Sequence, residues 1–492
     1  MICDNLTPVT ILLETLVLCS EKAADIARLI RTQYALFPTL IQHKTHKESG
    51  TNFAADVMTL ADVLIQQSIR HDIGKEFPGF GDSVYGEENS VFRAAQSGEN
   101  IQLTIPQTLD ELQTQVLVDQ PSLAGALAEL ILCPLSHFRL RSAVREHLVS
   151  ISQLDVSARL DLTQFAVWVD PIDGTAEYVK GNACDVSSEE TRAPSLDIIS
   201  PHVFRYRISG TLGNVTVLIG LFNRTSRLPV FGVINQPFFP RVAANLGNSQ
   251  PSGRLFWGST LGGSYLSSNC LPSSAPSITK CFPDWSFQEL FSLSDPMNNV
   301  GRLRVACSSS DLDSLERILK GQLKRTIGMP SLPFNYTPVD DDLPPELVFV
   351  SCAGAGFKLL CLILCQLDIY LLLKPNTYFW DTCAPHAILH ARGGGLIRLK
   401  PALSYVREQS MTGVCDLDPS TLRDFEVHYS VKPSDYTIFF YSGGLLTSLS
   451  SRQDLSCCCN LDGLLAYRDG RIACQFLHRL ARSVNTVDEL FD

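Results

Sequence analysis

The chain has 492 residues, of which 45% are hydrophobic and 18% are charged, and its formal net charge at pH 7 is −11. This composition is typical of a globular protein with a large core, and it excludes a disordered chain. The negative charge argues against nonspecific binding of nucleic acid, which needs a basic surface. An anionic substrate would have to bind where a metal ion or a lysine reverses the local field.

The N-terminus and the apolar stretches bear on where the protein resides. The N-terminal segment lacks a basic region and Glu14 interrupts its apolar run, so we expect no secretion signal. The most apolar stretch, 359–373, is too short for a bilayer span and includes Asp368. We therefore expect a cytoplasmic protein with no membrane partner, and free thiols at its sixteen cysteines. We further expect a monomer.

Two helices and a short strand are predicted first along the chain. Apolar residues recur at helical spacing in 12–35 and again in 53–71. Asp56 and Thr59 precede the second apolar series, where either could cap the helix. Val84-Tyr85 is a short predicted strand that follows a turn-rich segment.

Two adjacent carboxylates follow this strand. Glu87 and Glu88 come directly after Gly86, and on a strand they would point to opposite faces. One of them could therefore bind a metal while the other supports it. The alternative is an exposed acidic loop, which is common.

The central stretch is Asp170-Pro171-Ile172-Asp173-Gly174-Thr175. Residues 165–169 are apolar and predict a buried strand, which we expect to end at Asp170 because Pro171 lacks the N–H that a sheet ladder needs. Two carboxylates and the Thr175 hydroxyl then emerge close together. Hard oxygen ligands near an expected helix N-terminus suggest Mg²⁺ and phosphate. A pair of ordinary turns is the alternative.

The remaining elements of the N-terminal half are mostly strands. The predicted elements are a helix at 123–131, a loop at 184–209, a β-hairpin of 214–222 with 229–235, and a strand at 255–258. Residues 264–299 are rich in Ser, Pro and Asn, so we place a domain boundary there. We expect an α+β domain with a mostly antiparallel sheet over 1–265.

Strands alternate with helices after the boundary, which predicts an α/β domain over 300–485. The strands are predicted at 303–307, 347–351 and 368–373, and the helices at 312–323, 356–366 and 382–391. Residues 331–345 are predicted to be a surface insertion. Asp381 stands where a strand passes into the last helix, and Pro385 fits the first turn of that helix.

Three motifs stand in order along the chain. They are Gly86-Glu87-Glu88, Asp170 to Thr175, and Trp380-Asp381 followed after eleven residues by Gly393-Gly394. Together they resemble the signatures of the lithium-sensitive, magnesium-dependent phosphomonoesterases, the inositol monophosphatase superfamily. The resemblance covers about 12–468 and implies an α/β fold, a layered αβαβα sandwich.

Further stretches resemble one branch of this superfamily, the inositol polyphosphate 1-phosphatases. They are 20–24, 59–64, 77–79, 215–220, 232–237, 353–358, 386–389 and 463–468. This resemblance implies a Mg²⁺-dependent hydrolase that removes the 1-phosphate from inositol polyphosphates, such as inositol 1,4-bisphosphate and inositol 1,3,4-trisphosphate, in phosphatidylinositol signalling. Gly174 and 383–385 look more like the 3′(2′),5′-bisphosphate nucleotidases, so that activity is the alternative.

The resemblance also implies roles for single residues. Two or more Mg²⁺ would be bound by Glu87, Asp170, the carbonyl of Ile172, Asp173 and Asp381. Thr175 would hydrogen-bond the attacking water, Asp56 would orient Thr175 and accept its proton, and Glu87 would complete the catalytic group. Substrate contacts would come from Gly174, Thr175, Ser309, Gly354, Ala355 and Lys358.

Three further interpretations complete the sequence picture. Asp311 stands where the branch has a basic residue, and we expect it to repel a distal phosphate. His386 lies on a predicted buried helix and is interpreted as structural. A non-catalytic phosphate-binding relative is a further alternative, against which the intact acidic residues of the three motifs argue.

Overall fold

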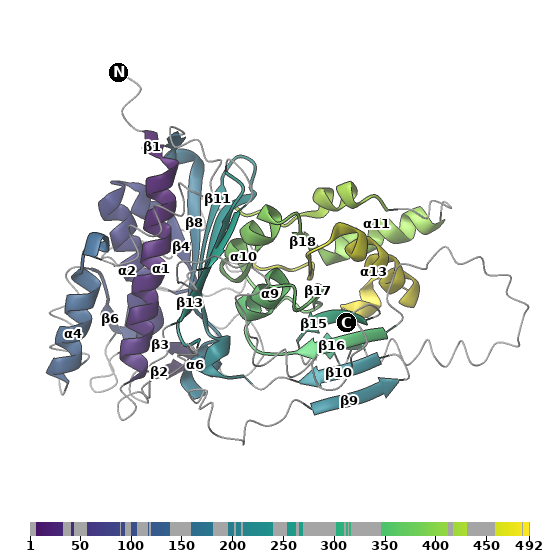
Figure 1. Cartoon of the computed structure of the whole chain (residues 1–492), viewed down its shortest axis with the longest axis horizontal. Helices are drawn as coiled ribbons and strands as arrows, with labels where there is room; N and C mark the ends of the chain where they lie inside the picture. The colour runs from purple at the N-terminus through teal and green to yellow at the C-terminus, as the bar shows by residue number, and fades with distance from the viewer. Residues whose placement is uncertain are drawn as a thin grey trace, which may run out of the picture.

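The fold has five layers, in which two β-sheets alternate with three layers of helices (Figure 1). The computed structural model describes residues 6–32, 41–43, 57–88, 90–93, 100–105, 117, 120–137, 159–180, 195–200, 203–207, 210–239, 253–261, 265–268, 302–308, 311–312, 314–315, 346–411, 417–430, 458–484 and 486–491. The predicted layered α/β sandwich is confirmed.

The first sheet has the strand order β14-β13-β12-β11-β8-β4. Its strands are β4 (Val84–Gly86), β8 (Phe165–Asp173), β11 (Thr216–Asn223), β12 (Pro229–Gln236), β13 (Arg254–Ser259) and β14 (Tyr265–Ser268). All neighbours pair antiparallel except β4 with β8. The predicted hairpin is β11 with β12.

The second sheet has the strand order β18-β19-β17-β15-β16-β10-β9. Its strands are β9 (Ser195–Ser200), β10 (Val203–Arg207), β15 (Arg302–Cys307), β16 (Glu346–Ser351), β17 (Ile369–Leu372), β18 (Gly395–Arg398) and β19 (Leu464–Tyr467). The strands from β10 to β17 run parallel, and both edges are antiparallel.

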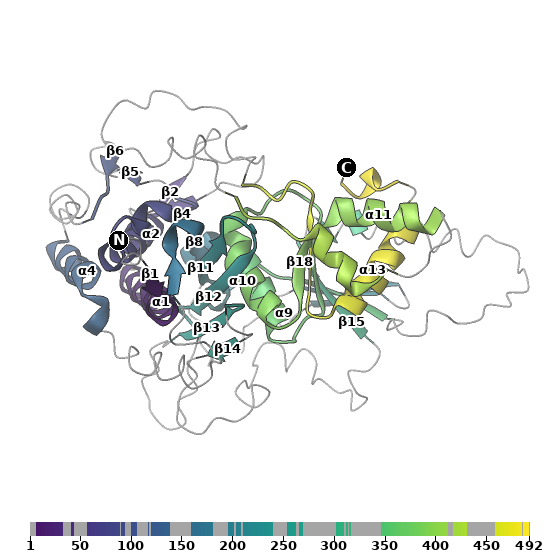
Figure 2. The ribbon, with the colours of Figure 1, turned by 90° about the horizontal axis from the view of Figure 1, so that it is seen from above.

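Helices cover both sheets and fill the space between them (Figure 2). The outer layers hold α1 (Val9–Arg31), α2 (Leu60–Glu76) and α4 (Pro121–Leu132) on one side, and α11 (Leu399–Met411) and α13 (Gly470–Ser483) on the other. The middle layer holds α9 (Ala355–Ile363) and α10 (Phe379–Ala391). Each layer boundary is an apolar core of buried side chains.

Shorter elements complete the described chain. They are the pairs β1 (Leu6–Pro8) with β7 (Arg159–Asp161), β2 (Ile41–His43) with β3 (Val57–Thr59), and β5 (Val91–Arg93) with β6 (Asn100–Gln102), the helix α6 (Thr175–Lys180), and the 3-10 helices Phe80–Ser83, Leu135–His137, Leu162–Gln164, Leu212–Asn214, Pro419–Phe425 and Asp488–Leu490.

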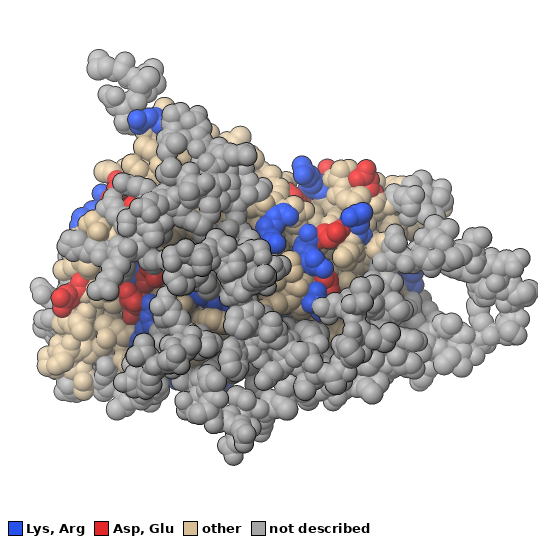
Figure 3. All heavy atoms as spheres, in the orientation of Figure 1, with Lys and Arg blue, Asp and Glu red and all other residues tan. Residues whose placement is uncertain are grey.

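None of the helices described is long and apolar enough to cross a membrane. On the face drawn in Figure 3, acidic and basic side chains of the described residues are interspersed.

Two loop predictions are wrong. Within 184–209, β9 and β10 form an antiparallel pair that extends the second sheet beside β16. The predicted linker 264–299 opens with β14, and 269–299 lie outside the described residues. Both errors concern strands at or near a sheet edge, whose extended state depends on pairing with distant segments. The division into 1–265 and 300–485 stays a prediction, although β9 and β10 join the later sheet.

Helix α10 lies against a row of glycines on the first sheet. Gly220 of β11 and Gly232 of β12 are cross-strand partners, and α10 packs over both strands. A Cβ added at Gly220 would lie 2.6 Å from the backbone N of Ala384 and 2.7 Å from the sulfur of Cys383. Glycine within a strand often marks such a close approach of another backbone. The row therefore sets how near α10 comes to the sheet.

We expect Gly220→Ala to destabilise the protein by about 1–3 kcal/mol, because the added methyl must displace the backbone of α10. Gly125→Ala in α4 is the matched control, since its Cβ would meet nothing within 4 Å. That control should stabilise the protein by about 0.5–1 kcal/mol, because alanine favours a helix interior. Urea denaturation measures both changes. Equal effects of the two variants would contradict the tight contact.

Candidate active site

A β-bulge in β8 brings two carboxylates to one face of the first sheet. Asp170 pairs with Leu218, and Asp173 with Thr216, so three steps along β8 match two steps along β11. In a regular strand, residues three apart point to opposite faces, but the extra residue in the bulge removes that difference. The prediction that the strand ends at Asp170 is wrong, because the bulge accommodates Pro171 and β8 continues to Asp173.

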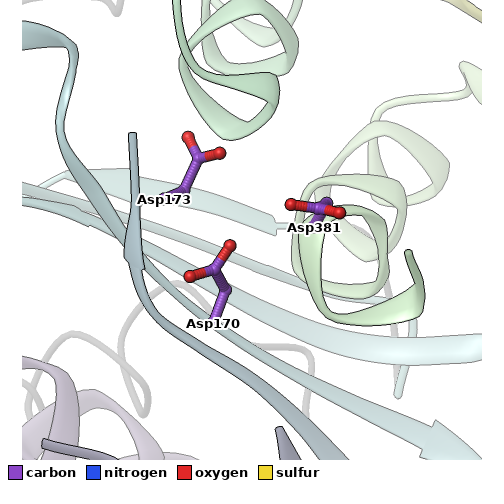
Figure 4. Close-up of side chains that lie close together, drawn as sticks. All are labelled: Asp170, Asp173 and Asp381. Atoms are coloured by element: carbon purple, nitrogen blue, oxygen red, sulfur yellow. The ribbon is translucent and has the colours of Figure 1, made fainter. Parts of the chain in front are cut away.

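Asp381 joins them from the first turn of α10. One oxygen from each of Asp170, Asp173 and Asp381 lies within 4.8 Å of the others, and Figure 4 shows the three side chains around one space. The helix begins at Phe379, and the Tyr378 N–H donates to Asp381 Oδ2 over 2.5 Å. The predicted place of Pro385 in the first turn is therefore wrong, since it lies inside the helix.

Asp173 is held by groups of the opposite layer. Its carboxylate accepts hydrogen bonds from the N–H groups of Ala355 and Gly356 and from the Thr216 hydroxyl, each over 3.0 Å. The first two come from the N-terminus of α9, where unpaired N–H groups favour an anion. A Cβ at Gly356 would lie 2.6 Å from Thr216 Oγ1, so only glycine fits beside this network.

The three carboxylates repel one another in a buried setting. Burial raises the pKa of Asp170 well above its usual value, and the charges of Glu87 and Asp173 raise it further. Burial and the same kinds of neighbours raise the pKa of Asp381. Burial also raises the pKa of Asp173, although the Lys358 ammonium and the hydrogen bonds to Asp173 oppose that rise. A divalent cation would relieve this repulsion, and an all-oxygen ligand set suits Mg²⁺.

The two glutamates after β4 lie in different surroundings. Glu88 is buried, and Gln66 of α2 both accepts from its N–H and donates to its carbonyl. Glu87 is half-buried, and its N–H donates to the carbonyl of Val169 over 3.3 Å. Its charge reaches Asp170 and Asp381, but its carboxylate does not belong to the cluster of three.

The other predicted site residues that the structure describes lie near this cluster. The Thr175 hydroxyl donates to the carbonyl of Ile172 over 3.0 Å. Gly174 has a φ of +84°, and an added Cβ would lie 3.5 Å from Glu177 Oε2. Lys358 is buried, and its Nζ donates to the Gly354 carbonyl over 3.1 Å. Asp56 and Ser309 lie outside the described residues.

Sequence reasoning did not assign Asp62 and Thr216 to the site. Asp62 is fully buried, accepts from the N–H and hydroxyl of Thr59, and raises the pKa of Asp170. The predicted capping role of Thr59 is thus confirmed, and the spacing Thr59-x-x-Asp62 is the signal of a capping box. Nothing in the local sequence of Thr216 indicates its bond to Asp173, because that bond depends on the strand register.

Asp311 lies beside the end of β17, and its expected effect on a distal phosphate stays a prediction. Its side chain is fully buried, and its Oδ2 accepts from the Leu373 N–H over 3.2 Å. The carboxylate therefore holds the backbone directly after β17.

We expect Asp170→Asn to stabilise the metal-free protein at neutral pH. The pKa of Asp170 is raised in the folded state, so its ionisation favours the unfolded chain, and this loss of stability vanishes as the pH falls towards about 4. Thermal unfolding in chelator should give a higher Tm for the variant at pH 7 and a smaller difference in acid. Mg²⁺ should raise the Tm of the unmodified protein only. A variant with a lower Tm than the unmodified protein in chelator at pH 7 would speak against mutual repulsion.

Known proteins are similar to this chain over most of its length. Residues 137–427 match the inositol monophosphatase family. The chain is 35% identical over 396 residues to the inositol polyphosphate 1-phosphatase of Mus musculus, covering 80% of this chain and 84% of the relative. It is 34% identical over 395 residues to that of Bos taurus, with the same coverage. Identity to the 3′(2′),5′-bisphosphate nucleotidase 1 of Mus musculus is 26% over 384 residues, covering 77% and 83%.

The resemblance drawn from the three motifs is thus confirmed by alignments that extend far beyond them. The matched residues 137–427 include Asp170, Asp173 and Asp381, which the structure brings together. Because the family match spans more than half of the sequence and the 1-phosphatases align over most of their length, this chain belongs to the inositol monophosphatase family.

Proposed function

We propose that this chain is a metal-dependent phosphomonoesterase that removes the 1-phosphate from inositol polyphosphates such as inositol 1,4-bisphosphate and inositol 1,3,4-trisphosphate, in phosphatidylinositol signalling. The observation that carries the proposal is the convergence of two buried carboxylates and the half-buried Asp381 beside the buried Lys358. Similarity to the 1-phosphatases over four-fifths of the chain supports the choice of substrate.

The cluster of Asp170, Asp173 and Asp381 is proposed to hold two or more Mg²⁺, with Glu87 and the carbonyl of Ile172 completing the ligand set. Mg²⁺ bound there would polarise the phosphate and lower the pKa of a water molecule. The bulge in β8 lets two of the ligands face the same metal, and α10 supplies the third from the opposite layer. The acidic cluster alone would repel a phosphate, so substrate binding depends on the metal.

Thr175 is proposed to hold the attacking water, and Asp56 to orient Thr175 and accept its proton. The Thr175 hydroxyl already lies at the carbonyl of Ile172, which is one of the proposed metal ligands. A water held by Thr175 would therefore be close to the metal and to the phosphorus. Because Asp56 lies outside the described residues, its role rests on the family resemblance alone.

The phosphate is proposed to bind near Gly174, Thr175, Ser309, Gly354, Ala355 and Lys358. Lys358 supplies the positive charge, and its hydrogen bond to the Gly354 carbonyl fixes its head group. The Ala355 N–H is already donated to Asp173, so Ala355 contributes by holding that ligand as well. A local cation of this kind offsets the net charge of −11.

A bisphosphate nucleotidase is the second candidate. Gly174-Thr175-Ala176-Glu177-Tyr178 looks more like the nucleotidases than like the 1-phosphatases, and a Cβ added at Gly174 would lie 3.5 Å from Glu177 Oε2. The lower identity of 26% to a nucleotidase favours the inositol phosphate. A cytoplasmic location, a monomeric state and the lack of a nucleic-acid or membrane partner stay predictions.

We expect Asp381→Asn to lower kcat/KM by more than about 100-fold while the protein stays folded. Removing a group that hydrogen-bonds a metal ligand typically lowers metal affinity or activity by about 10–100-fold, so removing a ligand itself should cost more. Asp82→Asn is the control, because that side chain is 86% exposed and pairs only with Arg70 among the described residues. Phosphate release with Mg²⁺ measures both variants. Retained turnover in the Asp381 variant would refute the metal assignment.

The substrate choice predicts a rate difference in the unmodified protein. Inositol 1,4-bisphosphate should be hydrolysed faster than adenosine 3′,5′-bisphosphate, with Mg²⁺ required for both. Li⁺ should inhibit the reaction, as the family resemblance implies. Phosphate release from the two compounds under matched conditions decides the order. Faster turnover of the nucleotide would replace the first proposal by the second.

A further inference from the structure

The first turn of α10, which carries Asp381, lacks one regular helical hydrogen bond. Pro385 lies inside this helix and has no N–H to donate to the carbonyl of Asp381, four residues before it. A proline inside a helix costs about 3 kcal/mol in isolation. The turn that positions Asp381 therefore depends on contacts from outside the helix backbone.

A series of buried side-chain hydrogen bonds reaches this turn. The Thr382 hydroxyl donates to the carbonyl of Tyr378 over 3.1 Å, and the Tyr429 hydroxyl donates to Thr382 Oγ1 over 3.4 Å. His386 Nδ1 lies 3.1 Å from the Tyr429 oxygen. All three side chains are buried. They form a chain from His386 through Tyr429 and Thr382 to Tyr378.

The tautomer of His386 is linked to the direction of the Tyr429 hydroxyl. When that hydroxyl donates to Thr382, its oxygen accepts from the Nδ1–H tautomer of His386. His386 Nε2 then carries a lone pair, and it has no hydrogen-bond partner among the described residues. Burial lowers the pKa of His386 well below its usual value, which agrees with a neutral ring.

Tyr429 is fixed by contacts that do not involve α10. Its N–H donates to the carbonyl of Arg227, in the turn between β11 and β12, over 2.8 Å. Two residues earlier, the Val427 N–H donates to the carbonyl of Leu396 in β18 over 3.0 Å. The segment 426–429 thus connects the two sheets. The Tyr429 ring packs against Phe222 of the first sheet, with the ring centroids 6.1 Å apart.

This series of hydrogen bonds ends at Tyr378, the residue that holds the Asp381 carboxylate. Tyr378 accepts from Thr382 through its carbonyl and donates its N–H to Asp381 Oδ2. Its ring stacks on Trp380 with a centroid distance of 4.5 Å. A shift of Tyr378 would therefore move the donor to Asp381 and the aromatic neighbour of the same turn together.

We propose that Tyr429 is a positioning residue for the metal site: its hydroxyl, through Thr382, holds the first turn of α10 so that the Asp381 carboxylate faces Asp170 and Asp173. The inference rests on the proposed function, in which Asp381 binds the metal. It also makes the structural role predicted for His386 specific, because His386 hydrogen-bonds the Tyr429 hydroxyl.

The test compares variants that remove or keep single hydroxyl groups in the full chain. Tyr429→Phe and Thr382→Val remove a hydroxyl with little change of shape, whereas Thr382→Ser keeps it. Tyr467→Phe is the control, because Tyr467 is also buried but lies in the core between the second sheet and its outer helices. Mn²⁺ affinity is measured by electron paramagnetic resonance, kcat with Mg²⁺ by phosphate release, and the mobility of residues 376–384 by amide hydrogen exchange.

We expect Tyr429→Phe and Thr382→Val to weaken Mn²⁺ binding by about 10-fold, the lower end of the range seen for outer partners of metal ligands, and to speed exchange in 376–384. Thr382→Ser and Tyr467→Phe should stay within about twofold of the unmodified protein in Mn²⁺ affinity. An unchanged Mn²⁺ affinity in Tyr429→Phe, or equal losses in Thr382→Ser and Thr382→Val, would overturn the inference.

The same measurements separate this inference from the proposed function. An unmodified protein that binds Mn²⁺ through the Tyr429-dependent site, yet hydrolyses no inositol phosphate, leaves the positioning role standing and refutes the proposed substrate. An unmodified protein that hydrolyses inositol 1,4-bisphosphate, with Mn²⁺ affinity independent of Tyr429, refutes the positioning role alone. Failure of the unmodified protein to bind Mn²⁺ refutes both.

Discussion

The mutual repulsion of three closely spaced carboxylates is the constraint on which the rest of this structure depends. Burial raises the pKa of Asp170, Asp173 and Asp381, and the charges of neighbouring carboxylates raise the pKa of Asp170 and Asp381 further. Backbone N–H groups help to keep two of them in place. Asp173 is held by the N-terminus of α9, and Asp381 by the Tyr378 N–H. Holding the carboxylates together lowers the stability of the protein without a cation. Binding of a cation would relieve the repulsion and recover that stability.

The layered architecture explains how such a cluster can persist. The middle helices α9 and α10 lie between two sheets, so neither helix can move away from the carboxylates without opening a core. The glycines at 220 and 232 let α10 approach the first sheet closely enough for Asp381 to reach β8. The segment 426–429 ties both sheets together beside the same helix. Packing far from the three carboxylates thus contributes to their geometry.

Most helices and central strands could be predicted because their signals are local. The amphipathic pattern of 12–35 became α1, and the apolar segments before and after 223–228 became the hairpin of β11 and β12. The two prolines show where local rules fail. Pro171 and Pro385 each lack an N–H, as expected, but a bulge accommodates the first and outside contacts support the turn beside the second. The missing N–H of each proline could be predicted from the sequence, but the neighbouring segments determine whether the strand or helix continues past it.

The sequence by itself determined the order and spacing of the three motifs, the excess of acidic residues and, through both, the family and the kind of chemistry. It also identified Asp170, Asp173 and Asp381 as candidates, since carboxylates at these junctions are visible in the chain. Only the tertiary structure decided that they face one space, that Asp311 turns inward, and that Thr216 and Tyr429 support the site. These facts depend on strand register and on contacts between distant segments. Neither leaves a periodic signal in the sequence, because each is set by the packing of layers against one another.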